Sequence, residues 1–413
     1  MKSSLLILIG LWSAIGIAAE LDPVPLKEKL PNGREISLKE VRRFTEGVPV
    51  SGQDGQTRPF NFLSFHYTEI ALSPDGSVLA MAQDNGVDLF DIATGTRVRS
   101  LTFPTLATLA EERAIAFSPN GRYLAFGLNG REGTGSPLTR EIAIWDLATG
   151  QQHPKSISQE NAPPFNWPLY FSPEGECLFF VQKTPYADLK DWLWRIEIKG
   201  GGQCPHSPVF EANKIETTAL STDGRMLAAS SGGKVAWYDL SRQKRLGEIT
   251  DLQDGPVGGP RNVLFSPDGK KLVVTVDRVS QYRWPKSSEL LIWDLASKTL
   301  VGNIYGPSSV HWDLSSIVPV GFSRDGDLLF SVEQVEGRSD WKIWNMENRQ
   351  EVLKGNKTTE NAKIGFSTRS NRIATISVEP TPRPARMAND SYPGNDRRVL
   401  RIFEVVQSDP PSH

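Results

Sequence analysis

The stretch "LFSPDGKKLVV", residues 264–274, places a Pro-Asp-Gly turn between two short apolar runs. Proline presets the backbone angle that begins a tight turn and glycine accepts the positive angle that ends it, so the stretch predicts two antiparallel strands joined by a corner. Related phrases recur with the corner serine at Ser73, Ser118, Ser172, Ser221, Ser266 and Ser323, and in a weaker form at Ser367. Seven copies of one strand–corner–strand unit predict an array of seven small sheets.

A second phrase follows each corner and ends a later strand. It reads "IWDL" at residues 144–147 and 292–295, and its second position is aromatic in all seven copies: Phe90, Trp145, Trp194, Tyr238, Trp293, Trp344 and Phe403. The paired phrases resemble the blades of WD-repeat proteins, in which a strand ends in a Trp-Asp dipeptide. The resemblance covers about residues 65–406. It implies an all-β, seven-bladed β-propeller of four-stranded antiparallel blades.

The chain departs from that family in one respect. The Gly-His pair that usually precedes the first strand of a WD-repeat blade is absent. The resemblance includes a buried Asp-His-Ser/Thr-Trp hydrogen-bond relay that depends on this histidine. We therefore expect the relay to be missing or rewired.

A ring of blades has to be closed, and the two chain ends indicate how. The last residues, "QSDPPSH" at 407–413, are polar and broken by proline, so they cannot supply the outer strand of the seventh blade. The segment "REISLKEVRRF", about residues 34–44, precedes the first blade and is predicted to be that missing strand. The expected organisation is a signal peptide at 1–19, an N-terminal segment at 20–64, the propeller at 65–406 and a tail at 407–413.

The first residues have the pattern of an export signal. Lys2 is followed by an apolar run from Leu5 to Ala19, which ends in small residues before Glu20. The run is shorter than the ~20 residues that span a bilayer, so we expect a cleaved signal and a secreted or periplasmic protein with no remaining membrane span. An uncleaved anchor is the alternative. A net charge of -2 and a pI near 6.3 argue against nucleic acid as a partner.

The spacing between the two phrases shows where the chain varies. From corner serine to signature aromatic there are 17 residues in blades one and four, and 21 to 36 in the others, so the extra residues fall between the second and third strands. In an antiparallel blade this hairpin opens on the face that also carries the connection to the next blade, here called the loop face. WD-repeat propellers use this face most for partners. Blades one and four lack the extra residues and lie roughly across the ring from each other. This suggests a trough between them that would suit an extended peptide or glycan.

Two insertions have the composition of a binding surface. They are "DRVSQYRWPKSS" at 277–288 in blade five and "EPTPRPARMANDSYPGNDR" at 379–397 in blade seven. Tyrosine, tryptophan and arginine dominate binding hot spots, because they bury area with little loss of entropy. The predicted partner-binding residues are Arg278, Tyr282, Arg283, Trp284, Arg383, Arg386 and Tyr392. The alternative is that Tyr282 and Trp284 pack on neighbouring loops and that the Arg-Pro alternation only stiffens its hairpin.

Signals of catalysis are weak in this sequence. The five histidines have no metal-ligand spacing, and no nucleophile motif or phosphate-binding glycine loop is present. We therefore predict a non-enzymatic scaffold with no catalytic residues, no metal and no cofactor. The alternative is a propeller hydrolase or lactonase in which acids such as Glu69, Glu216 and Glu360 hold a metal in the central channel.

The two cysteines offer at most one disulfide. Cys177 begins the second strand of blade three and Cys204 lies near its fourth, with a whole strand between them. Neighbouring strands are ~4.8 Å apart, which separates the two by nearly 10 Å. A bridge needs alpha carbons within about 7 Å, so it would form only if the loop "GGGQCP" curled back.

Overall fold

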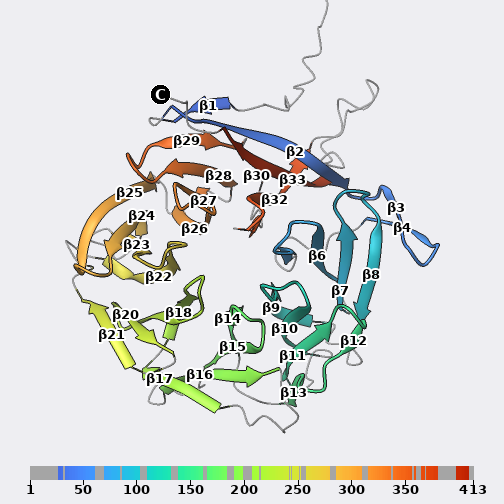
Figure 1. Ribbon diagram of the computed structural model, residues 1–413, viewed down its shortest axis with the longest axis horizontal. Coiled ribbons are helices and arrows are strands. Elements are labelled where there is room, and N and C mark those ends of the chain that lie inside the picture. Colours follow the sequence, from blue (N-terminus) through green and yellow to red (C-terminus); the bar gives the residue numbers. More distant parts are fainter. Residues whose placement is uncertain are drawn as a thin grey trace, which may run out of the picture.

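Seven β-sheets stand around a central axis in the computed structural model, and each sheet is one blade of a propeller (Figure 1). The structure describes residues 27–30, 33–60, 69–83, 86–102, 109–131, 138–160, 165–183, 190–198, 207–213, 215–240, 242, 244–250, 252, 257–279, 285–308, 315–335, 338–355, 358–359, 364–367, 369–379 and 397–408. Every regular element within these ranges is a strand, and they contain no helix that is long and apolar enough to cross a membrane. The predicted all-β, seven-bladed fold is confirmed.

Blades one to six run antiparallel from the channel outward in chain order. Blades one to three contain β5 (Ile70–Leu72), β6 (Val78–Gln83), β7 (Gly86–Asp91) and β8 (Arg97–Thr102); β9 (Leu109–Phe117), β10 (Tyr123–Arg131), β11 (Leu138–Asp146), β12 (Gln151–Gln152) and β13 (Ile157–Glu160); and β14 (Phe165–Phe171), β15 (Cys177–Gln182), β16 (Lys190–Glu197) and β17 (Ser207–Asn213). Blades four and five contain β18 (Ile215–Leu220), β19 (Met226–Ser231), β20 (Lys234–Asp239) and β21 (Lys244–Ile249); and β22 (Val257–Phe265), β23 (Lys271–Val279), β24 (Pro285–Asp294) and β25 (Thr299–Ser308).

Blades six and seven complete the ring. Blade six contains β26 (Ser316–Phe322), β27 (Leu328–Val335), β28 (Arg338–Asn345), β29 (Glu351–Lys354) and β30 (Thr358–Thr359). Blade seven contains β31 (Ile364–Ser367), β32 (Arg372–Glu379), β33 (Arg397–Gln407), β2 (Glu35–Thr45) and β1 (Lys27–Lys29). A separate hairpin, β3 (Pro49–Ser51) and β4 (Thr57–Pro59), leads from β2 toward blade one.

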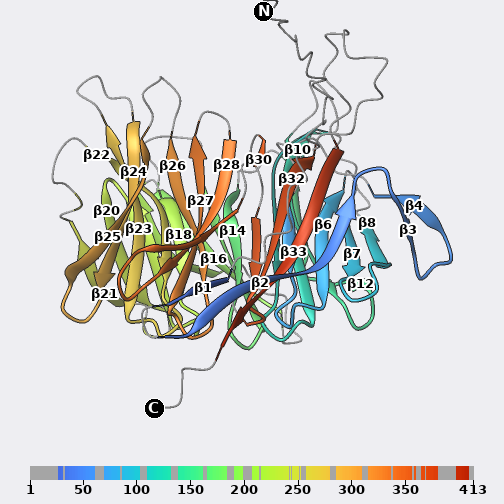
Figure 2. The same cartoon turned by 90° about the horizontal axis from the view of Figure 1, so that it is seen from above.

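The predicted ring closure is confirmed. Strand β2 pairs antiparallel with β33, from Ile36 opposite Gln407 to Thr45 opposite Val399, so one blade is built from both ends of the ring (Figures 1 and 2). A further strand, β1, pairs with the outside of β2 and makes this sheet five-stranded, which the sequence did not predict.

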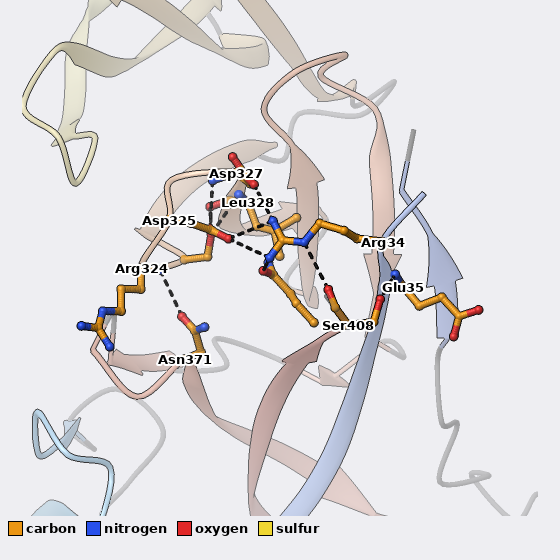
Figure 3. A network of polar contacts seen from close by, with 10 residues as sticks. Arg34, Glu35, Arg324, Asp325, Asp327, Leu328, Asn371 and Ser408 are labelled. Carbon is orange, nitrogen blue, oxygen red and sulfur yellow. Dashed lines mark hydrogen bonds and ion pairs between the residues drawn. The ribbon is translucent and has the colours of Figure 1, made fainter. Parts of the chain in front are cut away.

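Arg34 fastens the closing strand at one end. Its guanidinium lies 2.9 Å from an Asp327 carboxylate oxygen and 3.3 Å from one of Asp325, both in the corner region of blade six (Figure 3). It also donates to the Gln407 side chain at 2.7 Å and to the Ser408 carbonyl at 3.3 Å. One side chain therefore links the N-terminal segment, blade six and the end of blade seven.

Glu46 fastens the other end of β2 and makes closure sensitive to pH. Burial opposes ionisation of Glu46, but hydrogen bonds from the Arg398 side chain and backbone amide, together with the Arg398 charge, outweigh it and lower the pKa of Glu46. The pair is largely buried, with 27% of the Glu46 side chain and 16% of the Arg398 side chain exposed. Stability from this pair should be fully present above the unfolded-state pKa of about 4.3 and lost as pH falls through the folded-state pKa.

We expect Glu46→Gln to lower the free energy of unfolding by about 1 kcal/mol at pH 7, and the difference from wild type to be smaller at pH 3. Denaturant unfolding at both pH values measures this. Glu404→Gln is the control, since this carboxylate lies 3.8 Å from Arg372 and is 39% exposed, and it should change stability by less than about 0.5 kcal/mol. An effect of Glu46→Gln that is the same at both pH values would contradict the assignment.

The corner phrase depends on a buried serine. Ser118 is fully buried; its hydroxyl accepts the amide hydrogen of Tyr123 at 2.8 Å and donates to the Asn120 side chain at 2.7 Å. Gly121, which follows Asn120, has a φ of 72°, in the region that favours glycine. This corner thus satisfies its own polar groups while it reverses the chain, which explains why Ser-Pro-Asp-Gly recurs.

Apolar side chains between neighbouring blades form the core. Leu79 and Met81 of blade one pack with Ala374 and Leu400 of blade seven, and all four are buried. Equivalent clusters join blade one to blade two and blade four to blade five. Because both faces of each small sheet are apolar, one blade cannot cover itself, and the ring buries every face against a neighbour.

One of the seven predicted signature aromatics is wrong. In blades two, five and six the residue six positions after the corner serine pairs with the signature tryptophan, as in Leu272 opposite Trp293. In blade three the same position, Leu178, pairs with Ile196, whereas Trp194 pairs with Phe180. The sequence "DWLWRIEI" alternates with a period of two, so a shift of two residues keeps the same face and escapes detection.

The tryptophan end of the expected hydrogen-bond relay differs between two blades. In blade six the Trp344 indole nitrogen donates to the buried Ser331 hydroxyl at 2.7 Å. In blade five the position equivalent to Ser331 holds Val274, and the indole nitrogen of Trp293 has no hydrogen-bond partner within the described ranges. Blade six retains the tryptophan-to-hydroxyl link that blade five lacks.

Candidate interaction surfaces

The blades differ in height on the loop face. The second and third strands are six residues long in blades one and four, against nine in blade two and eight to eleven in blades five to seven. In blade three they have six and eight residues. Part of each insertion therefore extends a hydrogen-bonded ladder. The longer strands of blades two and five to seven end on the upper side of the ring in Figure 2.

Of the seven predicted binding residues, the structure describes the backbone of one. Arg278 lies near the end of β23, opposite Val257 of β22 and Ser287 of β24, at the loop-face end of blade five. The other six, Tyr282, Arg283, Trp284, Arg383, Arg386 and Tyr392, lie outside the described residues. Their insertions start from β23 and β32, in blades five and seven, with blade six between them.

An anchored cation stands on the channel side of blade five. Arg261 belongs to β22, the innermost strand, and its side chain is 55% exposed while it contacts the buried carboxylate of Asp277. Burial raises the pKa of Asp277, and the charge and hydrogen bond of Arg261 oppose that rise. The pair fixes a guanidinium between two neighbouring strands of blade five. Asp277 belongs to the segment predicted to be an insertion, and nothing in the sequence pairs it with Arg261.

The acids considered for a channel metal are spread around the ring. Glu69 lies just before β5 in blade one and Glu216 lies in β18 of blade four, while Glu360 lies outside the described residues. No three His, Cys, Asp or Glu residues in the described part of the chain are grouped so that they could hold a metal ion. Cys177 begins β15 as expected, and its proposed partner Cys204 is also outside the described residues.

The outer wall of blade one contains a cavity of about 340 Å³. It lies between the β3–β4 hairpin and strands β7 and β8, with the apolar lining residues Phe60, Met81, Val87, Phe90 and Leu101 and polar residues that include Arg58, Asp88 and Ser100. Two contacts hold the hairpin against blade one. Gly52 and Arg97 form an isolated backbone β-bridge, and the Arg97 side chain forms an ion pair of 3.1 Å with Asp54. This site could not be predicted from the sequence, since its two walls lie about 40 residues apart.

No protein-family model matches the chain. An uncharacterised WD repeat-containing protein of Synechocystis sp. is 26% identical over 148 residues, which is 35% of this chain and 37% of that protein's length. The matched stretch therefore spans little more than a third of the relative.

Two solved structures share the architecture at low sequence identity. The β-propeller domain of Cps50 (Swd1) from Myceliophteria thermophila is 13% identical, with a TM-score of 0.56, and the alignment covers 89% of this chain and all of that domain. Hydrazine synthase of Kuenenia stuttgartiensis is 14% identical, with a TM-score of 0.55, over 84% of this chain and 96% of that one. At this identity the likeness concerns the fold alone. Both structures agree with the β-propeller fold of this chain.

Proposed function

We propose that this protein is an exported, non-enzymatic scaffold that binds a partner protein or an extended peptide through the loop face. The observation that carries the proposal is the uneven height of that face. Short hairpins in blades one and four alternate with tall ladders in blade two and in blades five to seven. A rigid ring with raised sides supports binding of an extended segment across the low blades.

Two arginines on the inner strands of blade five support binding through the same face. Arg261 is exposed toward the channel but anchored by a buried carboxylate, and Arg278 lies on the adjacent strand. An arginine held in place by an ion pair loses little further entropy on binding, so it suits carboxylate or backbone carbonyl groups of a partner. The proposed export rests on residues 1–19, which have the pattern of a signal peptide.

A paired capture experiment tests the proposal. One bait is the chain from Glu20 to His413; the second has residues 280–284 and 380–396 replaced by the Gly-Gly turn that blade four uses at Gly232 and Gly233. We expect the intact bait to capture its partner from an extract of the source organism and the shortened bait to lose at least about 90% of it, because hot-spot residues carry most of the binding energy.

The matched control changes the opposite face, where the corners lie. Arg225→Ala with Lys270→Ala removes two exposed charges from corners of blades four and five and should leave capture unchanged. The thermal midpoint of the shortened bait should stay within a few degrees of wild type, which separates lost binding from lost folding. Equal capture by the intact and shortened baits would show that the loop face is not the interface.

A further inference from the structure

The cavity of about 340 Å³ beside blade one has an apolar base. Val50, Phe60 and Phe90 are among its lining residues, and the rings of Phe60 and Phe90 meet edge to face with their centroids 5.2 Å apart. Pockets for small molecules usually have volumes of about 300–1,000 Å³ and combine an apolar lining with a few polar groups. The size and the base of this cavity therefore suit a small molecule with an apolar chain or ring.

The walls of the cavity are held together without a ligand. The amide of Gln53 donates to the Arg97 carbonyl at 2.9 Å, beside the ion pair between Arg97 and Asp54. A Cβ on Gly52 would lie 2.3 Å from a carboxylate oxygen of Asp54 and 2.9 Å from a guanidinium nitrogen of Arg97. The hairpin can therefore approach β8 this closely only because residue 52 has no side chain.

Arg58 faces the cavity from the hairpin. Val50 and Arg58 lie directly opposite each other in the β3–β4 pairing, and such residues project from the same face of an antiparallel pair. Val50 packs against the core cluster that contains Phe60 and Phe90, so this face is turned toward blade one. The Arg58 guanidinium donates to the Gln56 side chain at 2.7 Å and forms no ion pair with any residue in the described part of the chain.

Arg97 supplies a second guanidinium, which is buried. It lies on β8 opposite Phe90 of β7 and is 6% exposed. Within the described ranges its side chain bonds to Asp54 alone, through one nitrogen. A hydrogen bond from the Gln56 amide, together with the charges of Arg97 and Arg58, lowers the pKa of Asp54. Two guanidiniums thus share one carboxylate, which leaves an excess of one positive charge at this end of the cavity.

The acid that lines the cavity lies apart from this positive end. Asp88 pairs with Ser100 across β7 and β8, and its carboxylate accepts a hydrogen bond from the Ser100 hydroxyl at 2.5 Å. Asp88 is two residues from Phe90 along β7, which separates their alpha carbons by about 7 Å on one face of the strand. Since Phe90 lies opposite Arg97, the lining has a positive end and a negative end with apolar side chains at its base.

We propose that this cavity binds a small amphipathic carboxylate, a molecule with one apolar chain or ring and one anionic end. The apolar part lies against Phe60 and Phe90, and the carboxylate lies between Arg58 and Arg97. The planar guanidinium matches a carboxylate in shape and stays charged at every physiological pH. The site is separate from the loop face, so it can bind this ligand whether or not a partner protein is bound there.

Isothermal titration calorimetry of the purified protein with octanoate tests the site. We expect one molecule to bind per chain, with an affinity that falls about fourfold for each methylene removed from the alkyl chain. 1-Octanol, which has the same chain without the charge, should bind about tenfold more weakly than octanoate. Equal affinity for octanoate and 1-octanol would contradict recognition of the anion by the two arginines.

Two variants separate the charged groups of the lining. Arg58→Gln should weaken octanoate about tenfold and leave 1-octanol unchanged, because only the anion uses the guanidinium. Asp88→Asn should tighten octanoate about threefold, because it removes a negative charge about 7 Å from the anion. Arg245→Gln is the matched control: it removes the same charge at a 57% exposed side chain of β21 in blade four and should change neither affinity.

Photo-labelling places the ligand on the chain. An octanoate analogue that carries a diazirine on its alkyl chain is cross-linked to the protein, and the labelled peptides are identified by mass spectrometry. We expect the label within residues 49–60 or 86–102, and excess octanoate should suppress it. Absence of saturable octanoate binding, equal binding by Arg58→Gln and wild type, or a label confined to other segments would overturn the proposal.

Discussion

A chain that begins at Gly47 is expected to lose the cooperative unfolding transition of the propeller and to aggregate. The deletion removes β1 and β2, and with β2 the buried side chains of Ile36, Leu38 and Phe44, which are 0%, 7% and 4% exposed. Full burial of three such side chains is worth about 5–9 kcal/mol, which approaches the whole stability of a typical protein. The deletion also leaves β33 as an open sheet edge.

The matched control is a chain that begins at Lys27, which keeps both strands and should unfold as the full chain does. A synthetic peptide of residues 27–46 added to the deleted chain should restore a cooperative transition by mass action, provided that it is added before aggregation. Circular dichroism on heating measures both. A deleted chain that unfolds cooperatively at the midpoint of the control would show that ring closure by β2 does not hold the propeller together.

Gly224→Ala is expected to lower the free energy of unfolding by about 2–5 kcal/mol. Gly224 has a φ of 65°, which costs a residue with a side chain about 1–2 kcal/mol. A Cβ there would also lie 2.0 Å from the ring of Pro173 in the corner of blade three, and such overlap adds about 1–3 kcal/mol. The cost arises between two blades, so it measures how tightly neighbouring corners are packed.

Gly121→Ala separates the two causes. Gly121 occupies the same corner position in blade two, with a φ of 72°, but an added Cβ would meet nothing within 4 Å. It should therefore cost only the backbone term of about 1–2 kcal/mol. Chemical denaturation of both variants gives the difference. Equal losses at the two positions would mean that the corners of blades three and four do not press on one another.

The ring could be predicted from the sequence because the motif that forms each corner is short and recurs along the chain. The corner of Ser118 satisfies its hydrogen bonds within six residues, so the same letters appear wherever the same turn is needed. Closure by β2 could be predicted by elimination, since the tail after Gln407 could not supply a strand. Trp194 shows the limit of this reasoning: a period of two fixes which face a residue belongs to, but not its position along the strand.

The candidate surfaces were harder to predict because they depend on contacts between distant segments. Arg261 and Asp277 lie on neighbouring strands, yet no local pattern pairs them. The cavity beside blade one needs the β3–β4 hairpin to fold against β8, which only the tertiary structure shows.

Photo-cross-linking from three positions tests the central claim, that the loop face binds the partner. A photoreactive residue is placed at Arg278 on the loop face, at Lys270 on the corner face or at Tyr305 on the outer wall, and the adducts formed in the source organism are identified by mass spectrometry. We expect Arg278 to yield an adduct with a second protein, and Lys270 and Tyr305 to yield none. A second protein captured from Lys270 and not from Arg278 would contradict the account.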